Sequence, residues 1–202
     1  MRLINSPYIF VLLNANVYKM PKIVAKKEDW INLGYRIFSE QGVAGIVVEK
    51  MAKALKVNKS SFYWHFKTRK EFIDQLIMFW KDKETDRIIN LTNDKKTGLE
   101  KFKAIIPLIY KQDPFLDFVF YLKRYARKEK RIQQIIDNIE KQRIDYACNL
   151  IQDMGYSKQE AKIKASSLHK HFIGYHEVIR YKEQSIDYVK EVELEIKQFI
   201  KY

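Results

Sequence analysis

The stretch Val48–Glu71, with the sequence VEKMAKALKVNKSSFYWHFKTRKE, decides how the first part of this chain folds. Its apolar positions 48, 51, 52 and 55 follow the i, i+3, i+4, i+7 spacing of one face of a short helix. Asn58 is a residue type that caps helix starts, and Phe62 and Phe66 lie four residues apart on the helix that follows. The stretch therefore predicts two short helices, the second over residues 59–66, joined by a tight turn.

A third helix precedes this pair. Its apolar stripe lies at helical spacing and consists of Trp30, Leu33, Ile37 and Phe38, and Gly42 marks the point where the helix stops. Three helices with a short turn between the last two form a helix-turn-helix unit. The second helix of such a pair enters the major groove of double-stranded DNA, because an α-helix fits the width of that groove.

The remainder of the chain is predicted to be helical, since no alternating strand pattern persists in it. The loop NLTNDKKTG at residues 90–98 interrupts the pattern, Pro107 bends or ends a helix, and Ser157 with Glu160 has capping-box spacing. We expect helices over about residues 70–89, 99–110, 115–126, 131–154, 158–181 and 185–200. The predicted fold class is all-α, with a helix-turn-helix domain at residues 22–68 and a larger helical domain at residues 69–202.

Basic residues are concentrated in the first part of the chain. Residues 19–70 carry 12 Lys and Arg against 4 Asp and Glu, whereas residues 71–202 carry 25 against 21. A basic module on a nearly balanced body favours a polyanion partner such as nucleic acid. A general compositional bias towards Lys, Ile, Asn and Tyr would produce a similar charge, so charge alone leaves both explanations open.

Residues 1–21 are predicted to be a disordered extension. The apolar run YIFVLL at residues 8–13 is too short for a membrane span, and the extension lacks the features of a signal peptide. A short anchor at a membrane surface is the alternative for this run. The one cysteine, Cys148, cannot form a disulfide within the chain, so nothing indicates an oxidising compartment. We expect a cytoplasmic protein that binds no membrane.

The polar face of the helix at 59–66 carries groups suited to DNA. With Phe62 and Phe66 buried, the side chains left to face outward are Lys59, Ser60, Ser61, Tyr63, Trp64 and His65. Hydroxyl and ammonium groups reach phosphates and base edges, and two outward aromatic side chains are costly to expose without a partner. Lys67, Arg69 and Lys70 add positive charge where the helix ends. The pattern indicates a DNA-reading helix rather than the corner of a helical bundle.

This stretch resembles the DNA-binding signature of the tetracycline-repressor (TetR) family of transcriptional regulators. The run from Phe62 to Phe66 (FYWHF), followed by Lys67 and a charged helix start, is the most specific part of a resemblance that covers about residues 26–80. The resemblance implies phosphate contacts by Tyr63 and Lys70. It implies base-edge contacts by Lys59, Ser60, Ser61, Trp64 and His65. The predicted DNA-binding set also includes Val48 and Lys67.

Two positions depart from the family pattern. The family places Thr or Ser at the start of the second helix, where this chain has Ile46 and Val47, so the capping hydroxyl and its phosphate contact are in doubt. The family also places Gly in the turn where this chain has Lys56. Because a Lys in the left-handed conformation costs ~1 kcal/mol, we expect an adjusted turn.

By the same resemblance, the body from about residue 98 to residue 202 holds a small-molecule cavity. The predicted cavity residues are Phe102, Tyr110, Phe118, Tyr121, Tyr125, Tyr146, His169, Phe172 and His176. Such a lining favours a lipophilic or aromatic effector, although each aromatic side chain would serve equally in an ordinary core. The histidines between residues 169 and 176 lack the convergence and the further ligands of a metal site, so we expect no metal and no cofactor.

A homodimer interface is predicted on the last two helices. The last helix has an apolar stripe, and small residues on the helix before it permit the close approach of a second copy. The predicted interface residues are Ser166, Ile173, Gly174, Val189, Val192, Ile196 and Phe199. Packing of the same stripe within one chain is the alternative.

The sequence therefore predicts a TetR-type regulator that binds operator DNA as a homodimer and is released, as a repressor, by a small-molecule effector. No nucleophile–base pair, carboxylate pair, metal-ligand spacing or phosphate loop indicates an enzyme. A helical scaffold or membrane-surface protein that uses the basic face and the YIFVLL run is the competing hypothesis.

Overall fold

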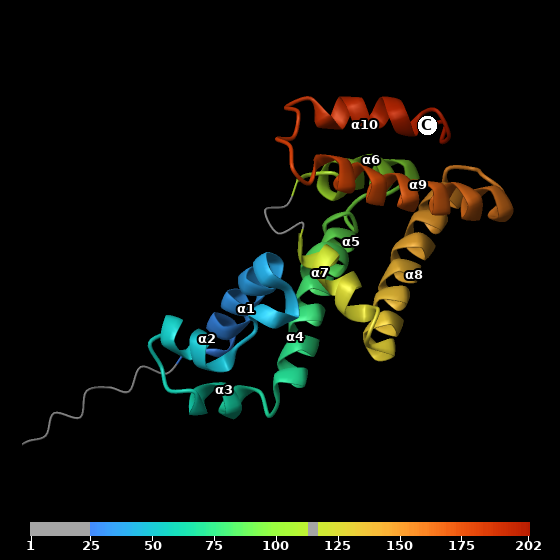
Figure 1. The fold of residues 1–202 in the computed structure, drawn as a ribbon. Helices are drawn as coiled ribbons and strands as arrows, with labels where there is room; N and C mark the ends of the chain where they lie inside the picture. Colours follow the sequence, from blue (N-terminus) through green and yellow to red (C-terminus); the bar gives the residue numbers. More distant parts are fainter. Residues whose placement is uncertain (1–24, 113–116) are drawn as a thin grey trace, which may run out of the picture.

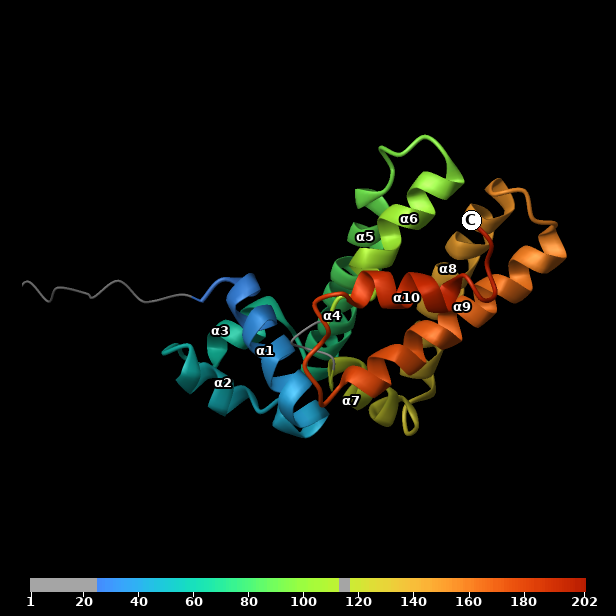
Figure 2. The same ribbon diagram turned by 90° about the horizontal axis from the view of Figure 1, so that it is seen from above.

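The computed structural model describes residues 25–112 and 117–202, and every regular element in these residues is a helix. The N-terminal lobe contains α1 (Lys27–Gln41), the 3₁₀ turn η1 (Gly42–Gly45), α2 (Val48–Ala54) and α3 (Ser60–His65). The connecting segment contains α4 (Arg69–Lys81), the π turn η2 (Asp82–Asp86) and α5 (Arg87–Leu91). The larger lobe contains α6 (Gly98–Ile109), α7 (Asp117–Ala126), α8 (Lys130–Asp153), α9 (Lys158–Ile179) and α10 (Tyr188–Ile196). Figure 1 shows α4 leading from α3 into the larger lobe, and Figure 2 shows the two lobes from above.

This all-α architecture of a small helix-turn-helix lobe and a larger helical lobe confirms the expected fold class. The capping box expected before α9 is present, since Glu160 N donates to Ser157 Oγ and Ser157 N donates to the Glu160 carboxylate. The helix expected over residues 70–89 is interrupted at η2, and α10 is shorter than the expected 185–200. The predicted extension at 1–21, its YIFVLL run and the predicted helix start at residue 115 lie outside the described residues.

The apolar core of the N-terminal lobe continues into the body. Trp30, Phe62 and Phe66 are fully buried in it, and the same cluster extends through α4, α7 and the first turns of α8. The members from those helices include Phe72, Trp80, Phe118, Leu122, Ile132 and Ile136. One continuous core therefore holds the helix-turn-helix on the body. The domain boundary at residue 68 stays a prediction.

A second core fills the larger lobe between α6, the end of α8, α9 and α10. Val192 and Ile196 are fully buried in it, because α10 folds back over α6 (Figure 1). The prediction that these two residues form a dimer interface is therefore wrong, and the alternative of packing within one chain holds for them. Phe199 is partly buried against the same core, and Val189 is half-buried.

The turn between α2 and α3 keeps the left-handed geometry that the family normally gives to glycine. Lys56 has φ of +56°, Lys56 N donates to Lys53 O at 3.1 Å, and Val57 N donates to Ala52 O at 3.0 Å. These two hydrogen bonds form a Schellman motif, which ends α2. The expectation of an adjusted turn is wrong, and the chain accepts the cost of a side chain in the left-handed region.

We predict that Lys56→Gly raises the free energy of unfolding by up to about 1 kcal/mol, because glycine adopts positive φ without steric cost. Urea unfolding followed by circular dichroism measures the change. The matched control is Lys50→Gly, at an exposed position inside α2, where glycine should lower the stability by about 1 kcal/mol. Equal destabilisation by the two variants would contradict a left-handed Lys56.

Candidate nucleic-acid interface and ligand cavity

Four fully buried aromatic side chains pack together on the inner side of the α3 helix. The Phe62 ring lies 5.3 Å from Trp30 of α1, 5.1 Å from Phe66 and 5.1 Å from Phe72 of α4, measured between ring centroids. The close approach of α1 and α4 depends on Gly34, because a Cβ there would lie 2.3 Å from Phe72 Cζ. Aromatic packing of this kind fixes both the position and the rotation of a short helix.

The opposite face of α3 is open. Trp64 is 78% exposed and Tyr63 is 49% exposed, and Lys59 and Ser60 are exposed beside them. In Figure 1, α3 lies at the lower end of the molecule, away from α9 and α10. The buried Phe62 and Phe66 and the outward Tyr63 and Trp64 lie on the faces that the sequence assigned to them.

Three residues of the predicted DNA-binding set are not free to reach DNA in this structure. Val48 is only 5% exposed and belongs to the core, so its side chain is wrongly assigned. The Ser61 hydroxyl is buried, with no hydrogen-bond partner in the described part of the chain. His65 is half-buried, and its Nε2 hydrogen-bonds with Ala25 O at 2.8 Å, which joins α3 to the start of α1. The helical spacing of the sequence did not show that the side chains of Val48, Ser61 and His65 point inward while their neighbours point outward.

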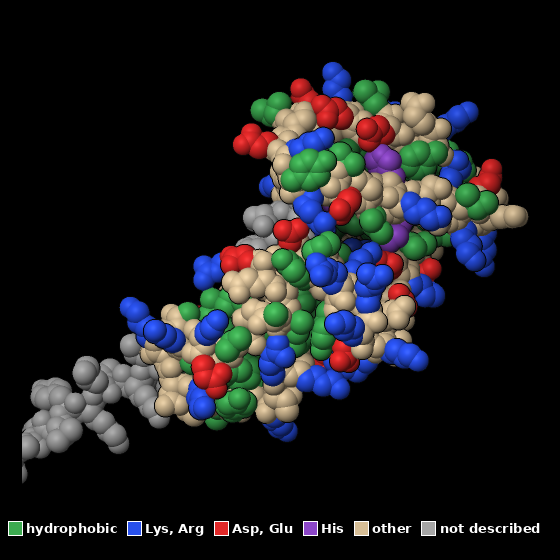
Figure 3. Space-filling view, in the orientation of Figure 1, with side chains coloured by type: hydrophobic (Ala, Val, Ile, Leu, Met, Phe, Trp, Pro, Cys, Tyr) green, Lys and Arg blue, Asp and Glu red, His purple; other side chains and the backbone are tan. Residues whose placement is uncertain are grey.

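Positive charge surrounds the exposed face. Residues 25–70 carry ten Lys and Arg against four Asp and Glu, and Lys67 and Lys70 are exposed just after α3. Lys59 Nζ lies 3.5 Å from Glu49, an exposed pair that contributes little to stability. Figure 3 shows Lys and Arg side chains around the lower lobe that contains α1–α3.

Arg69 has a structural role that the sequence did not reveal. Its Nε donates to Ile46 O at 2.8 Å, and its Nη2 donates to Val43 O. These bonds fasten the start of α4 to the segment before α2. Val47 precedes α2 and offers it no side-chain cap in the described structure, as expected. Arg69 thus fixes the backbone at the point where the capping hydroxyl of the family pattern is missing.

A cavity of about 520 Å³ lies in the body between α4, α5, α6, α7, α8 and α9. It falls within the volume range typical of small-molecule sites. Its wall is mainly apolar and aromatic. Of the predicted cavity residues, the structure places five on this wall, namely Phe102, Tyr146, His169, Phe172 and His176. Trp80, Arg143 and Arg180 also line it, and the sequence did not single them out.

Four of the predicted cavity residues lie elsewhere, so those assignments are wrong. Phe118 packs between Tyr35 and Phe38 in the first core. Tyr121 lies against Gly42, where a Cβ would come within 2.6 Å of its ring. Tyr110 is buried in the second core with its hydroxyl 2.8 Å from His171 Nδ1, and Tyr125 packs against the first core. Aromatic residues are common to cores and cavities, and only the fold separates the two uses.

Glu140 carries a strongly perturbed carboxylate on the cavity wall. It lies 3.9 Å from His169 Nε2 and 2.8 Å from Lys123 Nζ. The nearby His169 ring and the Lys123 ammonium hold the pKa of Glu140 at about 2. Glu140 is therefore ionised and engaged throughout the physiological pH range.

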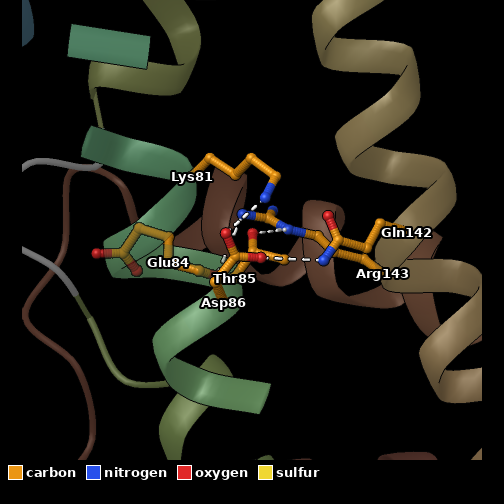
Figure 4. Close-up of polar contacts among 6 residues, drawn as sticks. All are labelled: Lys81, Glu84, Thr85, Asp86, Gln142 and Arg143. Carbon is orange, nitrogen blue, oxygen red and sulfur yellow. Dashed lines mark hydrogen bonds and ion pairs between the residues drawn. The ribbon is translucent and has the colours of Figure 1, made fainter. Parts of the chain in front are cut away.

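Arg143 places a guanidinium deep inside the body, beside the cavity (Figure 4). Its Nε donates to Thr85 Oγ1 at 2.9 Å, and its Nη2 donates to Glu84 O at 3.2 Å. Its Cζ lies 5.0 Å from the ring centroid of Trp80 and 5.9 Å from that of Phe172. Burial lowers the pKa of Arg143, but a guanidinium stays protonated in proteins.

The described residues contain no cluster of three His, Cys, Asp or Glu side chains that could hold a metal ion. Within the same residues, no helix combines the length and the apolar character that crossing a membrane requires.

Comparisons with known proteins agree with this geometry. Residues 31–76 match the family model described as bacterial regulatory proteins of the tetR family. The negative transcriptional regulator IcaR of the icaADBC biofilm operon of Staphylococcus aureus is 23% identical over 143 residues, which cover 68% of this chain and 72% of IcaR. The nucleoid occlusion factor SlmA of Vibrio campbellii is 26% identical over 117 residues, covering 54% of this chain but only 60% of SlmA.

The fold is also shared with solved structures. AibR, solved in complex with isovaleryl coenzyme A and operator DNA, superposes with a TM-score of 0.62 at 14% identity, covering 86% of this chain and 97% of AibR. The matched segment 31–76 contains Phe62, Phe66 and Phe72 of the aromatic support of α3, together with the exposed face of that helix. The helix-turn-helix geometry, the family model and the relatives together identify residues 31–76 as a segment of the tetR family of bacterial regulatory proteins.

Proposed function

We propose that this regulator is a ligand-responsive repressor that binds operator DNA as a homodimer. The observation that carries the proposal is the exposed Tyr63 and Trp64 face of α3, held on a fully buried aromatic base within a basic lobe. IcaR, a negative regulator of an operon, supports repression as the direction of control. The AibR complex supports a fold that can hold both an effector and operator DNA.

In the proposed complex, α3 lies in the major groove. Lys59, Ser60 and Trp64 contact base edges, and Tyr63, Lys67 and Lys70 contact phosphates on either side. A six-residue helix reads only a few base pairs. Sequence specificity therefore requires two copies of α3, at half-sites about 34 Å apart along the DNA.

The proposed dimer interface lies on the outer face of α9. Ile163, Ile173 and Val178 are exposed on α9, Tyr181 is exposed just after its end, and Gly174 lies between Ile163 and Val178. A Cβ built at Gly174 meets nothing within 4 Å in the described chain, so another helix can approach closely at this point. Exposed apolar residues along one helix favour a protein interface, and an isologous pair of α9 helices buries them in both copies. The half-buried Ser166 lies on the same helix.

The proposed effector site is the cavity, and residues that it shares with the first core couple it to α3. The residues that line the cavity and also belong to the core that supports the helix-turn-helix are Tyr35 of α1, Trp80 of α4, Leu122 of α7 and Ile136 of α8. A ligand that displaces them shifts α1 and α4, and with them the spacing of the two α3 helices. Binding that favours the shifted state releases the DNA.

We predict that Lys70→Ala weakens operator binding about equally for all DNA sequences and lowers the slope of log K against log salt by about one, because a phosphate contact is lost. Fluorescence anisotropy at several salt concentrations measures both quantities. Lys103→Ala, which removes the same charge from an exposed position of α6, should leave both unchanged. Equal effects of the two variants would mean that Lys70 acts only through net charge.

We predict that Ser60→Ala changes which DNA sequences are preferred rather than the affinity for all of them, because it removes a hydroxyl from the base-reading face. Selection of bound DNA from a random pool, with each variant in parallel, measures the preference. A site that distinguishes a base through this hydroxyl should lose about 1 to 3 kcal/mol of discrimination. An unchanged selected motif would exclude Ser60 from base reading.

We predict that Gly174→Glu yields a protein of 24.3 kDa in solution, the mass of one chain, where the unmodified protein has twice that mass. The added carboxylate fits the single chain but is buried without a partner between two copies. Size-exclusion chromatography with light scattering measures the mass, and operator affinity should fall with it. Gln133→Glu, on the exposed face of α8, is the matched control and should remain dimeric.

A further inference from the structure

The cavity combines an apolar wall with an excess of positive charge. The apolar part of the wall includes Trp80, Ile88, Phe102, Ile105, Leu150 and Phe172. Six Lys and Arg side chains line the cavity against three Glu. An apolar surface of this kind favours hydrocarbon, whereas the charge excess favours an anion.

Some of the cations are already neutralised by the protein. Lys123 pairs with Glu140 at 2.8 Å, and Arg180 pairs with Asp117 and with Glu177 at 3.0 Å each. The exposed side chains of Lys111, Arg124 and Arg127 form no ion pair within residues 25–112 and 117–202. They give the cavity an uncompensated positive field, which draws anions towards it. In Figure 3, Lys and Arg side chains gather beside a hollow where a His is visible.

Arg143 is the innermost of these cations, and its hydrogen bonds go to neutral oxygens. Its partners are the Thr85 hydroxyl and the Glu84 backbone carbonyl, and no described carboxylate lies within ion-pair distance of it. A guanidinium has five N–H groups, so these two bonds leave several unused. The carboxylates of Glu84, Asp86 and Glu140 are near enough to act on its charge, but none of them hydrogen-bonds to the guanidinium, so its free N–H groups favour a further anionic partner.

The neighbouring carboxylates are held by other groups. Asp86 accepts from Lys81 and from Gln142 Nε2, the latter at 3.0 Å, and Glu140 is engaged by Lys123 and His169. Figure 4 shows the Glu84 carboxylate pointing away from the Arg143 guanidinium. The carboxylates around Arg143 are thus directed elsewhere, while its planar face is framed by the Trp80 and Phe172 rings.

We propose that the cavity binds an amphipathic organic anion, whose acidic group pairs with Arg143 while its hydrocarbon part lies against the apolar wall. A guanidinium recognises a carboxylate through two parallel N–H···O bonds, which gives the ligand a fixed orientation. Lys111, Arg124 and Arg127 attract the anion to the cavity. This inference rests on the proposed function of the cavity as the effector site, and it narrows the expected lipophilic effector to one that carries negative charge.

The test compares three probes of equal chain length, octanoate, octan-1-ol and octylammonium, by isothermal titration calorimetry on the full-length protein. The proposal expects octanoate to bind about tenfold or more tightly than the other two, which is the ratio that one charge-assisted hydrogen-bonded pair supplies. Equal binding of octanoate and octan-1-ol, stronger binding of octylammonium, or no binding of any probe would each overturn it.

Variants of Arg143 test whether this residue binds the anion or only holds η2 to α8. Arg143→Gln should lower the octanoate affinity about tenfold and leave the octan-1-ol affinity unchanged, and Arg143→Lys should restore part of the preference. A structural role would lower both affinities together. Arg87→Gln, at an exposed position of α5 outside the cavity, is the matched control and should change neither.

Operator binding, measured separately by anisotropy, distinguishes the proposed anion site from the proposed effector role of the cavity. The circular dichroism spectrum and the melting temperature of ligand-free Arg143→Gln show whether the variant is folded. Octanoate that binds in the calorimeter without changing operator affinity would contradict the effector role of the cavity and leave the anion site standing. Operator release by octan-1-ol as effective as by octanoate would contradict the anion site and leave the effector role standing.

Discussion

The burial of Phe62 and Phe66 is the interaction on which the rest of this protein depends. The α3 helix has six residues, which is too short to persist in water without tertiary support. Burying a side chain of this size contributes about 1.5 to 3 kcal/mol. Packing against Trp30 and Phe72 therefore both forms α3 and fixes its rotation. Tyr63 and Trp64 lie between Phe62 and Phe66 in the sequence. Because the two Phe side chains fix one face of the helix inward, Tyr63 and Trp64 point outward.

That packing also links the DNA-reading end to the body. The core beneath α3 continues without a break through α4 to α7 and α8, and part of it forms the cavity wall. The π turn η2 lies where α4 passes the cavity, and Arg143 of α8 bonds to both Glu84 and Thr85 within it. A ligand at Arg143 would therefore meet the segment that connects the two lobes. Close-packed cores transmit such displacements because they have little free volume to absorb them.

Local patterns were sufficient for the helices and for the aromatic support of α3. Apolar spacing identified Phe62 and Phe66, and the Ser157–Glu160 spacing identified the start of α9. Long-range pairings were not accessible in this way. Arg69 reaches carbonyls more than 20 residues away, His65 reaches Ala25, and α10 turns its apolar stripe onto α6. Cavity residues were predicted only in part. Phe118 and Tyr121 are aromatic residues of predicted helices, as Phe102 and Phe172 are, and the sequence does not show that they lie in a different core.

The exposure of Trp64 has a practical consequence, because the chain has only three tryptophans and they occupy three different environments. Trp30 is buried in the support of α3, Trp64 faces solvent on its outer side, and Trp80 lies on the cavity wall. Indole emission depends on local polarity and on quenching by neighbours. Trp64 is thus a built-in optical reporter of contact at the DNA-reading face, and Trp80 is one of events in the cavity. In variants that keep only one of these two indoles, intrinsic fluorescence can follow each end of the molecule without a label.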